Sequence, residues 1–251
     1  MSLPRLCDFT CARVGLPRAG NSLPTNELLG LQLAHARARE AVHSELDSQR
    51  LAGELRPLGE EVLLVRSRVP DRATYLRRPD LGRRLSNESR VLLGRNEGKF
   101  DVAFVIADGL SATAVQLHAA RTIAASLSLL ELPEWKLAPF VIVEQGRVAI
   151  GDEIGECLGA GMSIVLIGER PGLSSSDSLG IYLSWSPRVD LTDADRNCIS
   201  NIRAEGLSYA AAGNKLVFLM NESRRRKLSG IQLKEAANLP GLTASFNHPI
   251  G

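Results

Sequence analysis

The chain of 251 residues is 44% hydrophobic and 23% charged, and its formal net charge is +2. This composition excludes a disordered chain, and the nearly balanced charge gives no indication of a nucleic-acid partner or an anionic membrane. No stretch approaches the roughly 20 apolar residues of a membrane-spanning helix, and the first ten residues lack the pattern of a secretory signal. We therefore expect a globular protein of the cytoplasm.

Four cysteines are too few and too scattered for a disulfide framework, so a reduced protein is expected. Cys7 and Cys11 lack a second Cys or His pair at zinc spacing. His35 and His43 lie about two helical turns apart, too far to share one metal ion without a third ligand between them. We predict no metal site.

Residues 1–58 are predicted to form a loop and a small helical appendage. A stripe of apolar residues that includes Leu28, Leu31 and Val42 has helical spacing, and Thr25 is a plausible N-cap for this helix. A second short helix is expected from Ser48 to Leu55, before a break at Pro57 and Gly59.

Residues 59–251 alternate strand-like and helix-like segments. Strands are expected over residues 61–69, between Phe100 and the turn at Asp108, near 139–144, 162–168 and over 180–187, the last with polar positions typical of a place near an edge. Residues 190–206 read as a loop into a helix that covers 207–226, and the tail from Asn238 is expected to fray. The pattern predicts an α/β protein with a doubly wound, mostly parallel, Rossmann-like sheet.

Two segments of this region favour an anionic ligand. The elbow RRPDLGRR carries Arg77, Arg78, Arg83 and Arg84, which either clamp a carboxylate or phosphate or form a solvated or subunit-facing surface; the sequence favours neither. A buried strand, a turn at Asp108-Gly109 and a helix that opens at Ser111 form the strand–turn–helix unit of nucleotide-binding folds. The full G-x-G-x-x-G fingerprint and the Walker pattern are absent, so this unit does not identify a ligand.

The stretch from Val141 to Ser178 holds the main candidate site. An apolar strand leads into a loop with the letters GRV, a helix follows from Asp152 to Leu158, and a second strand ends in the loop GERPGLSSSDS. Ligands bind at the carboxyl ends of strands in open α/β sheets, so these two loops are expected to form a site.

Acidic residues of this stretch differ in what they suggest. Asp152, Glu153 and Glu156 lie in the first turns of a helix, where acids suit the helix dipole, and this explanation is favoured over a cation site. Glu169 instead follows an apolar strand and precedes the rigid Pro171-Gly172 pair, so it is expected to contact a ligand or to pair with an arginine. No catalytic constellation is found, and no catalytic residue is predicted.

Several motifs together resemble one family. RAGNSLPT, LAHARARE, RRPDLGRRL, IADGLSATAV, EQGRVAIGDEIGE, IGERPGLSSSDSLGIY and DADRNCISNIR are similar to the small (light) subunit of ethanolamine ammonia-lyase, from about Arg13 to about Gly230. GERPGL and RNCISNI are the most specific of these motifs.

The resemblance implies a subunit of an adenosylcobalamin-dependent lyase that converts ethanolamine to acetaldehyde and ammonia by radical chemistry. It implies that the large subunit binds ethanolamine and carries the catalytic residues, so that this chain is not active alone. Residues 59–251 would cover the cobalamin, with Val148, Glu169 and Cys198 at the family's cofactor-binding positions. Packaging in a bacterial microcompartment stays open, because the amino terminus lacks the polar extension of some members.

Two other readings stay open from the residues themselves. One is a free-standing cobalamin- or nucleotide-binding module without catalytic activity. The other is a hydrolase in which Asp108 or Glu169 acts as the base.

Overall fold

The computed structural model describes residues 13–59, 61–130 and 134–234. In this part of the chain six strands form one sheet in the order β1-β3-β2-β4-β5-β6. The first four in this order are parallel, whereas β5 and β6 are antiparallel to their neighbours. Their bounds are β1 Val62–Arg66, β2 Ala103–Ala107, β3 Phe140–Glu144, β4 Met162–Gly168, β5 Leu179–Trp185 and β6 Arg196–Ile202. The predicted mostly parallel α/β sheet is confirmed.

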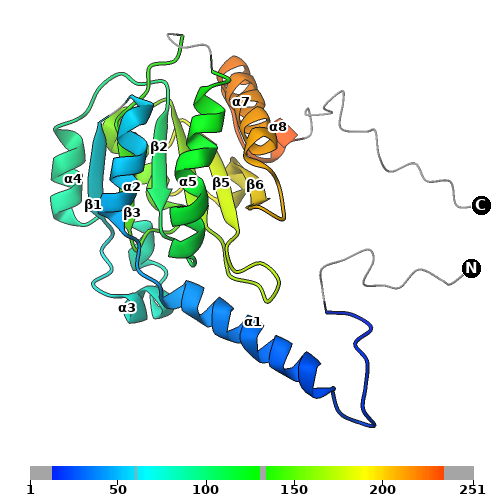
Figure 1. Ribbon diagram of the computed structural model, residues 1–251. Coiled ribbons are helices and arrows are strands. Elements are labelled where there is room, and N and C mark those ends of the chain that lie inside the picture. The colour runs from blue at the N-terminus through cyan, green and yellow to red at the C-terminus, as the bar shows by residue number, and fades with distance from the viewer. Residues whose placement is uncertain (1–12, 60, 131–133, 235–251) are drawn as a thin grey trace, which may run out of the picture.

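Helices cover both faces of this sheet (Figure 1). They are α1 Thr25–His43, α2 Ser48–Leu55, α3 Arg72–Arg77, α4 Asn87–Gly94, α5 Ala112–Leu127, α6 Ile150–Leu158, α7 Tyr209–Arg226 and α8 Ile231–Lys234, with short 3-10 turns at Arg56–Leu58, Leu81–Arg83 and Asp193–Asp195. None of these helices is long and apolar enough to cross a membrane.

Alternate residues of the strands supply two hydrophobic cores, because successive side chains of a strand point to opposite faces. Phe104 and Ile106 of β2 pack with α2, α5 and α7 on one face. Val105 and Ala107 of the same strand pack with α4 and α6 on the other. Every residue of β2 is buried, as expected for a strand in the middle of a sheet that is covered on both sides.

The two N-terminal helices differ in how they meet this body. α1 extends away from the sheet, and only Ala34 and Ala41 are buried along it (Figure 1). Leu51 and Leu55 of α2, in contrast, are fully buried members of the core beneath α5. The division of the chain at residue 58 stays a prediction, and α2 shares its core with the residues beyond that division.

Two details of the predicted elements are wrong. α1 begins at Thr25, and its N-cap is Pro24, which offers no side-chain hydrogen bond. The segment expected as a loop before the last helix contains β6, an edge strand whose pairing with β5 is interrupted by a register shift between Leu179 and Ile181. The shift separates the two inward-facing isoleucines, Ile199 and Ile202, by three positions instead of two, which hid the alternation of the strand.

The turns that surround the carboxyl ends of the strands follow the predictions more closely. The elbow between α3 and α4 breaks where expected, with a 3-10 turn at Leu81–Arg83. Gly109 has a φ of +59°, and the Ser111 side chain accepts a hydrogen bond from the Ala114 N–H at the start of α5. The tail from Asn238 and the pair Cys7 and Cys11 lie outside the described residues.

Candidate functional site

A cavity of about 400 Å³ opens where β2, β3 and β4 end. Parallel strands bring their carboxyl ends to one edge of a sheet, so the turns after these three strands meet there. The lining residues are Tyr75, Gly109, Leu110, Arg147, Val148, Ile167, Gly168, Glu169, Arg170 and Tyr182. Two of the three predicted site residues, Val148 and Glu169, therefore share one cavity.

Glu169 is held in place by hydrogen bonds from Ser178, just before β5, and from Asn201 of β6. Its Oε2 accepts hydrogen bonds from the Ser178 hydroxyl at 2.5 Å and from the Asn201 N–H at 3.2 Å. A Cβ at Gly180 would lie 2.9 Å from Oε1, so glycine leaves the room that this carboxylate occupies. Among the described residues Glu169 forms no ion pair, and no hydrogen bond reaches Oε1. Of the two roles predicted for Glu169, pairing with a neighbouring arginine is thus not observed.

Val148 lies in the turn between β3 and α6, and close packing and a hydrogen bond to the end of β2 hold this turn in place. Gln145 has a φ of +57°, and a Cβ on Gly146 would come within 3.1 Å of Ala107, so the backbone passes close to β2. The buried Asp108 carboxylate accepts hydrogen bonds from the Gly146 N–H at 3.0 Å and from the Gly109 N–H at 2.9 Å. The turn carrying Val148 is therefore tied to the end of the neighbouring strand.

Asp108 is only 3% exposed, and its Oδ2 lies 3.5 Å from a guanidinium nitrogen of Arg72. Burial raises the pKa of this carboxyl to about 6, against the opposing effect of Arg72 and of the backbone N–H groups. Asp108 is thus enclosed beneath the cavity, where it positions two turns. Asp108 does not line the cavity, so the geometry gives no support to a role as the base of a hydrolase, which would need contact with a substrate.

Tyr75 and Arg147 close another side of the cavity. The Tyr75 hydroxyl donates to the Gly146 carbonyl at 3.0 Å, and Arg147 stacks on the Tyr75 ring with its guanidinium carbon 3.9 Å from the centroid. Burial raises the pKa of the Tyr75 hydroxyl, so it stays a neutral donor. Sequence reasoning missed both residues as parts of the site, although Arg147 belongs to the GRV motif and gave a signal.

Cys198 lies on β6, directly opposite Tyr182 of β5. It is exposed and does not line the cavity itself, whereas Tyr182 does. The pKa of the Tyr182 hydroxyl is raised, first by burial and then by its neighbours Cys198 and Glu169. Tyr182 therefore lies between Cys198 and the cavity, whereas Cys198 itself is level with Val165 in the middle of β4 and not at the strand ends.

Two of the three acidic residues of α6, Asp152 and Glu153, form buried ion pairs, which the sequence did not reveal, whereas Glu156 is exposed. Glu153 accepts from the Leu85 N–H at 2.9 Å and lies 3.2 Å from Arg84 Nε, and Asp152 pairs with Arg196 on β6. Each of these two carboxylates is 2% exposed. Within residues 13–59, 61–130 and 134–234 no group of three or more Cys, His, Asp or Glu residues has a metal-binding arrangement.

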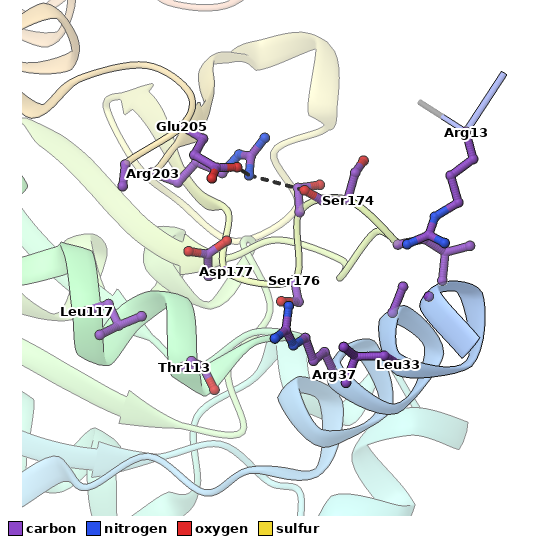
Figure 2. A pocket seen from close by; sticks show the side chains of 15 residues that line it. Arg13, Leu33, Arg37, Thr113, Leu117, Ser174, Ser176, Asp177, Arg203 and Glu205 are labelled. Atoms are coloured by element: carbon purple, nitrogen blue, oxygen red, sulfur yellow. Dashed lines mark hydrogen bonds and ion pairs between the residues drawn. The ribbon is translucent and has the colours of Figure 1, made fainter. Parts of the chain in front are cut away.

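A separate cavity of about 640 Å³ lies between α1 and the body of the protein (Figure 2). Figure 2 shows Leu33 on α1, Leu117 on α5 and the loop of Ser174 around it, and Arg203 donates to the Ser174 carbonyl at 3.2 Å. None of the predicted site residues lines this cavity. We therefore place the candidate site at the strand ends.

Comparison with known proteins identifies the family to which the chain belongs. The family model "Ethanolamine ammonia-lyase light chain (EutC)" matches residues 2–234. A protein of Ralstonia nicotianae named ethanolamine ammonia-lyase small subunit is 55% identical over 240 residues, which cover 94% of this chain and 89% of the relative. Proteins with the same name from Azotobacter vinelandii and Pseudomonas aeruginosa are 54% and 52% identical, over 96% and 94% of this chain and 91% and 88% of their own lengths.

The family match covers most of the chain, and the identity to these relatives is high over nearly the full length of each. The resemblance predicted from the motifs is thereby confirmed. The chain belongs to the family of ethanolamine ammonia-lyase light chains.

Proposed function

We propose that Val148, Glu169 and Cys198 form one wall of an adenosylcobalamin site in an ethanolamine ammonia-lyase. The observation that carries this proposal is the Glu169 carboxylate, which is held at a strand end with one oxygen, Oε1, left for a ligand. In the assembled enzyme the chain would act as the small subunit, while the large subunit binds ethanolamine and carries the catalytic residues.

The residues present fit the edge of a corrin ring. Amide side chains surround that ring, and an anionic oxygen is a strong acceptor for amide N–H groups. Val148 supplies an apolar contact beside the carboxylate, and the exposed Cys198 supplies a small, polarizable one. When bound, adenosylcobalamin supplies the radical that starts conversion of ethanolamine to acetaldehyde and ammonia.

The residues of this chain have supporting tasks in that reaction. Asp108 holds the turn of Val148 in place through Gly146, and Ser178 and Asn201 aim Glu169. Binding the cofactor in one orientation is their contribution, because a fixed geometry removes the entropy of positioning from the reaction. We assign no catalytic residue to this chain.

Replacement of Glu169 by glutamine tests the cofactor wall. Glu169→Gln removes the charge but keeps the shape, and we expect cobalamin affinity of the assembled enzyme to fall about tenfold, the loss typical of a hydrogen bond to a charged group. The measurement is an absorbance titration with cyanocobalamin after gel filtration has confirmed assembly. Glu205→Gln, an exposed acid at the separate cavity near α1, is the matched control. Unchanged affinity in Glu169→Gln would overturn the site.

Assembly with the large subunit distinguishes this proposal from a free-standing cobalamin- or nucleotide-binding module. We expect the chain to co-purify with the large subunit when the two are expressed together, and to lack ammonia-lyase activity alone. If the chain does not co-purify with the large subunit, the result would favour the free-standing module. We propose the cytoplasm as the site of action, and sedimentation of the native enzyme with or without shell proteins would establish whether a microcompartment packages it.

A further inference from the structure

A second cavity, of about 590 Å³, adjoins the candidate cofactor site. Arg147 and Val148 line both cavities, so the second begins where the proposed wall ends. Its remaining walls come from the elbow of residues 79–84, from the segment 189–193 and from Arg196. Four arginines face this space: Arg83, Arg84, Arg147 and Arg196.

Two of these arginines are neutralised inside the protein. Arg84 lies 3.2 Å from Glu153, which Arg90 also approaches to 3.4 Å. Arg196 pairs with two acids, Asp152 and, at 3.0 Å, Asp193, so the three arginines and three acids of this group balance. Asp80, another acid at the cavity, pairs with Arg78 at 2.8 Å. These pairs leave little charge for a ligand.

Arg83 and Arg147 form no ion pair with any residue that the structure describes. Of the other charged residues that line the cavity, only Asp190, from the 189–193 segment, likewise has no ion pair within the described part of the chain. Two free cations against one free carboxylate leave an excess of about one positive charge. A ligand group with a single negative charge matches this balance.

Arg147 is fixed before any ligand arrives. Its guanidinium stacks on Tyr75 and donates to the Tyr75 carbonyl at 3.0 Å, and its backbone N–H donates to the Gly82 carbonyl at 2.7 Å. Its Nε is buried without a hydrogen-bond partner in the described part of the chain. An arginine held in this way loses little entropy on binding, and its planar donors suit the oxygens of a phosphate.

We propose that Arg83 and Arg147 bind the phosphodiester in the nucleotide tail of the cobalamin. This inference rests on the proposed function, since the corrin must lie against Val148 and Glu169 for its tail to reach the second cavity. A phosphodiester carries one negative charge at neutral pH, which equals the charge excess of the site. The GRV turn then serves both parts of the cofactor, with Val148 toward the ring and Arg147 toward the phosphate.

The test compares two ligands on the assembled complex of this chain with its large subunit. Cyanocobalamin carries the phosphate, whereas dicyanocobinamide has the same corrin without phosphate or nucleotide. We expect Arg147→Gln and Arg83→Gln each to lower cyanocobalamin affinity about tenfold and to leave cobinamide affinity within about twofold. Affinity is measured by absorbance titration on complexes whose assembly gel filtration has verified.

Two further variants sharpen the comparison. Arg77→Gln removes a charge from the same RRPDLGRR elbow at a residue that lines neither cavity, and it should change neither affinity. Arg147→Lys keeps the charge and should retain more cyanocobalamin affinity than Arg147→Gln. If the ratio of cyanocobalamin affinity to cobinamide affinity stays unchanged in both glutamine variants, whether or not both affinities fall, the phosphate assignment is overturned. Glu169→Gln should weaken the binding of both ligands, because both carry the corrin. If it does not, the corrin wall of the proposed function is wrong, and this outcome is distinct from a failure of the phosphate assignment.

Discussion

The Asp108 carboxylate accepts a hydrogen bond from the Gly146 N–H at 3.0 Å, and this contact joins the end of β2 to the turn that carries Arg147 and Val148. One buried acid thus fixes the position of the turn whose residues line both cavities. The relationship makes the geometry of the proposed cofactor site sensitive to a residue that the cofactor does not touch.

Asp108 also predicts a dependence of stability on pH. Its pKa of about 6 in the folded chain lies above the usual 3.8, so the folded state binds the proton more tightly than the unfolded state. This group therefore makes the free energy of unfolding fall as pH rises from about 4 to 6, by about 3 kcal/mol in total. The stabilising contribution is fully present below pH 4 and is lost above pH 6.

Asp108→Asn removes this titration. We expect the free energy of unfolding of the variant, relative to the natural chain, to increase between pH 4 and pH 6 and to level off above. Urea unfolding at several pH values measures the difference, in which the effects of other carboxylates cancel. A difference that stays flat across this range would contradict the raised pKa of Asp108.

The ion pair between Asp152 and Arg196 gives a second prediction. Both side chains are 3% exposed, and burial raises the pKa of Asp152 in spite of the nearby guanidinium. Arg196→Met leaves a buried carboxylate without its partner, and we expect a loss of about 3 kcal/mol in the free energy of unfolding. The double variant Asp152→Leu with Arg196→Met should recover most of this loss, and a double variant as unstable as the single one would refute this account.

Leu55 tests how α2 relates to the rest of the chain. It is fully buried in the core beneath α5, so Leu55→Ala should lower the free energy of unfolding by about 3 kcal/mol through lost packing and a cavity. Leu29 of α1 is 59% exposed, and Leu29→Ala is the control that should change stability by less than about 0.5 kcal/mol. Chemical denaturation of both variants distinguishes a core helix from an independent appendage, for which the Leu55 variant would unfold in a separate transition.

The sequence predicted the features that depend on local pattern. Continuous apolar runs identified β2 and β4, and polar loops after β3 and β4 placed Val148 and Glu169 at strand ends. The fold class followed from the alternation of strands and helices. Cys198 came only from the family resemblance, because the segment around it did not read as a strand.

Features that depend on contacts between distant segments were missed. The register shift beside Ile199 and Ile202 broke the period of β6, and no local rule anticipates such a shift. The arginine partners of Asp152 and Glu153 come from other elements, so the sequence offered only the helix dipole and a cation site as explanations for these acids. Tyr75 reaches the site through a hydrogen bond to Gly146, 71 positions away.

The position of the cavity at the ends of β2, β3 and β4 has a consequence for folding. Its walls come from Tyr75, the turn at Gly109, the turn at Val148, the end of β4 and β5, so no fragment shorter than residues 75–182 contains all of them. The site exists only after the long-range pairing of the sheet is complete, and binding there is coupled to the global unfolding equilibrium. A ligand present at about 100 times its dissociation constant should raise the free energy of unfolding of the whole domain by about 2.7 kcal/mol. Retention of the ligand would then report the integrity of the entire sheet.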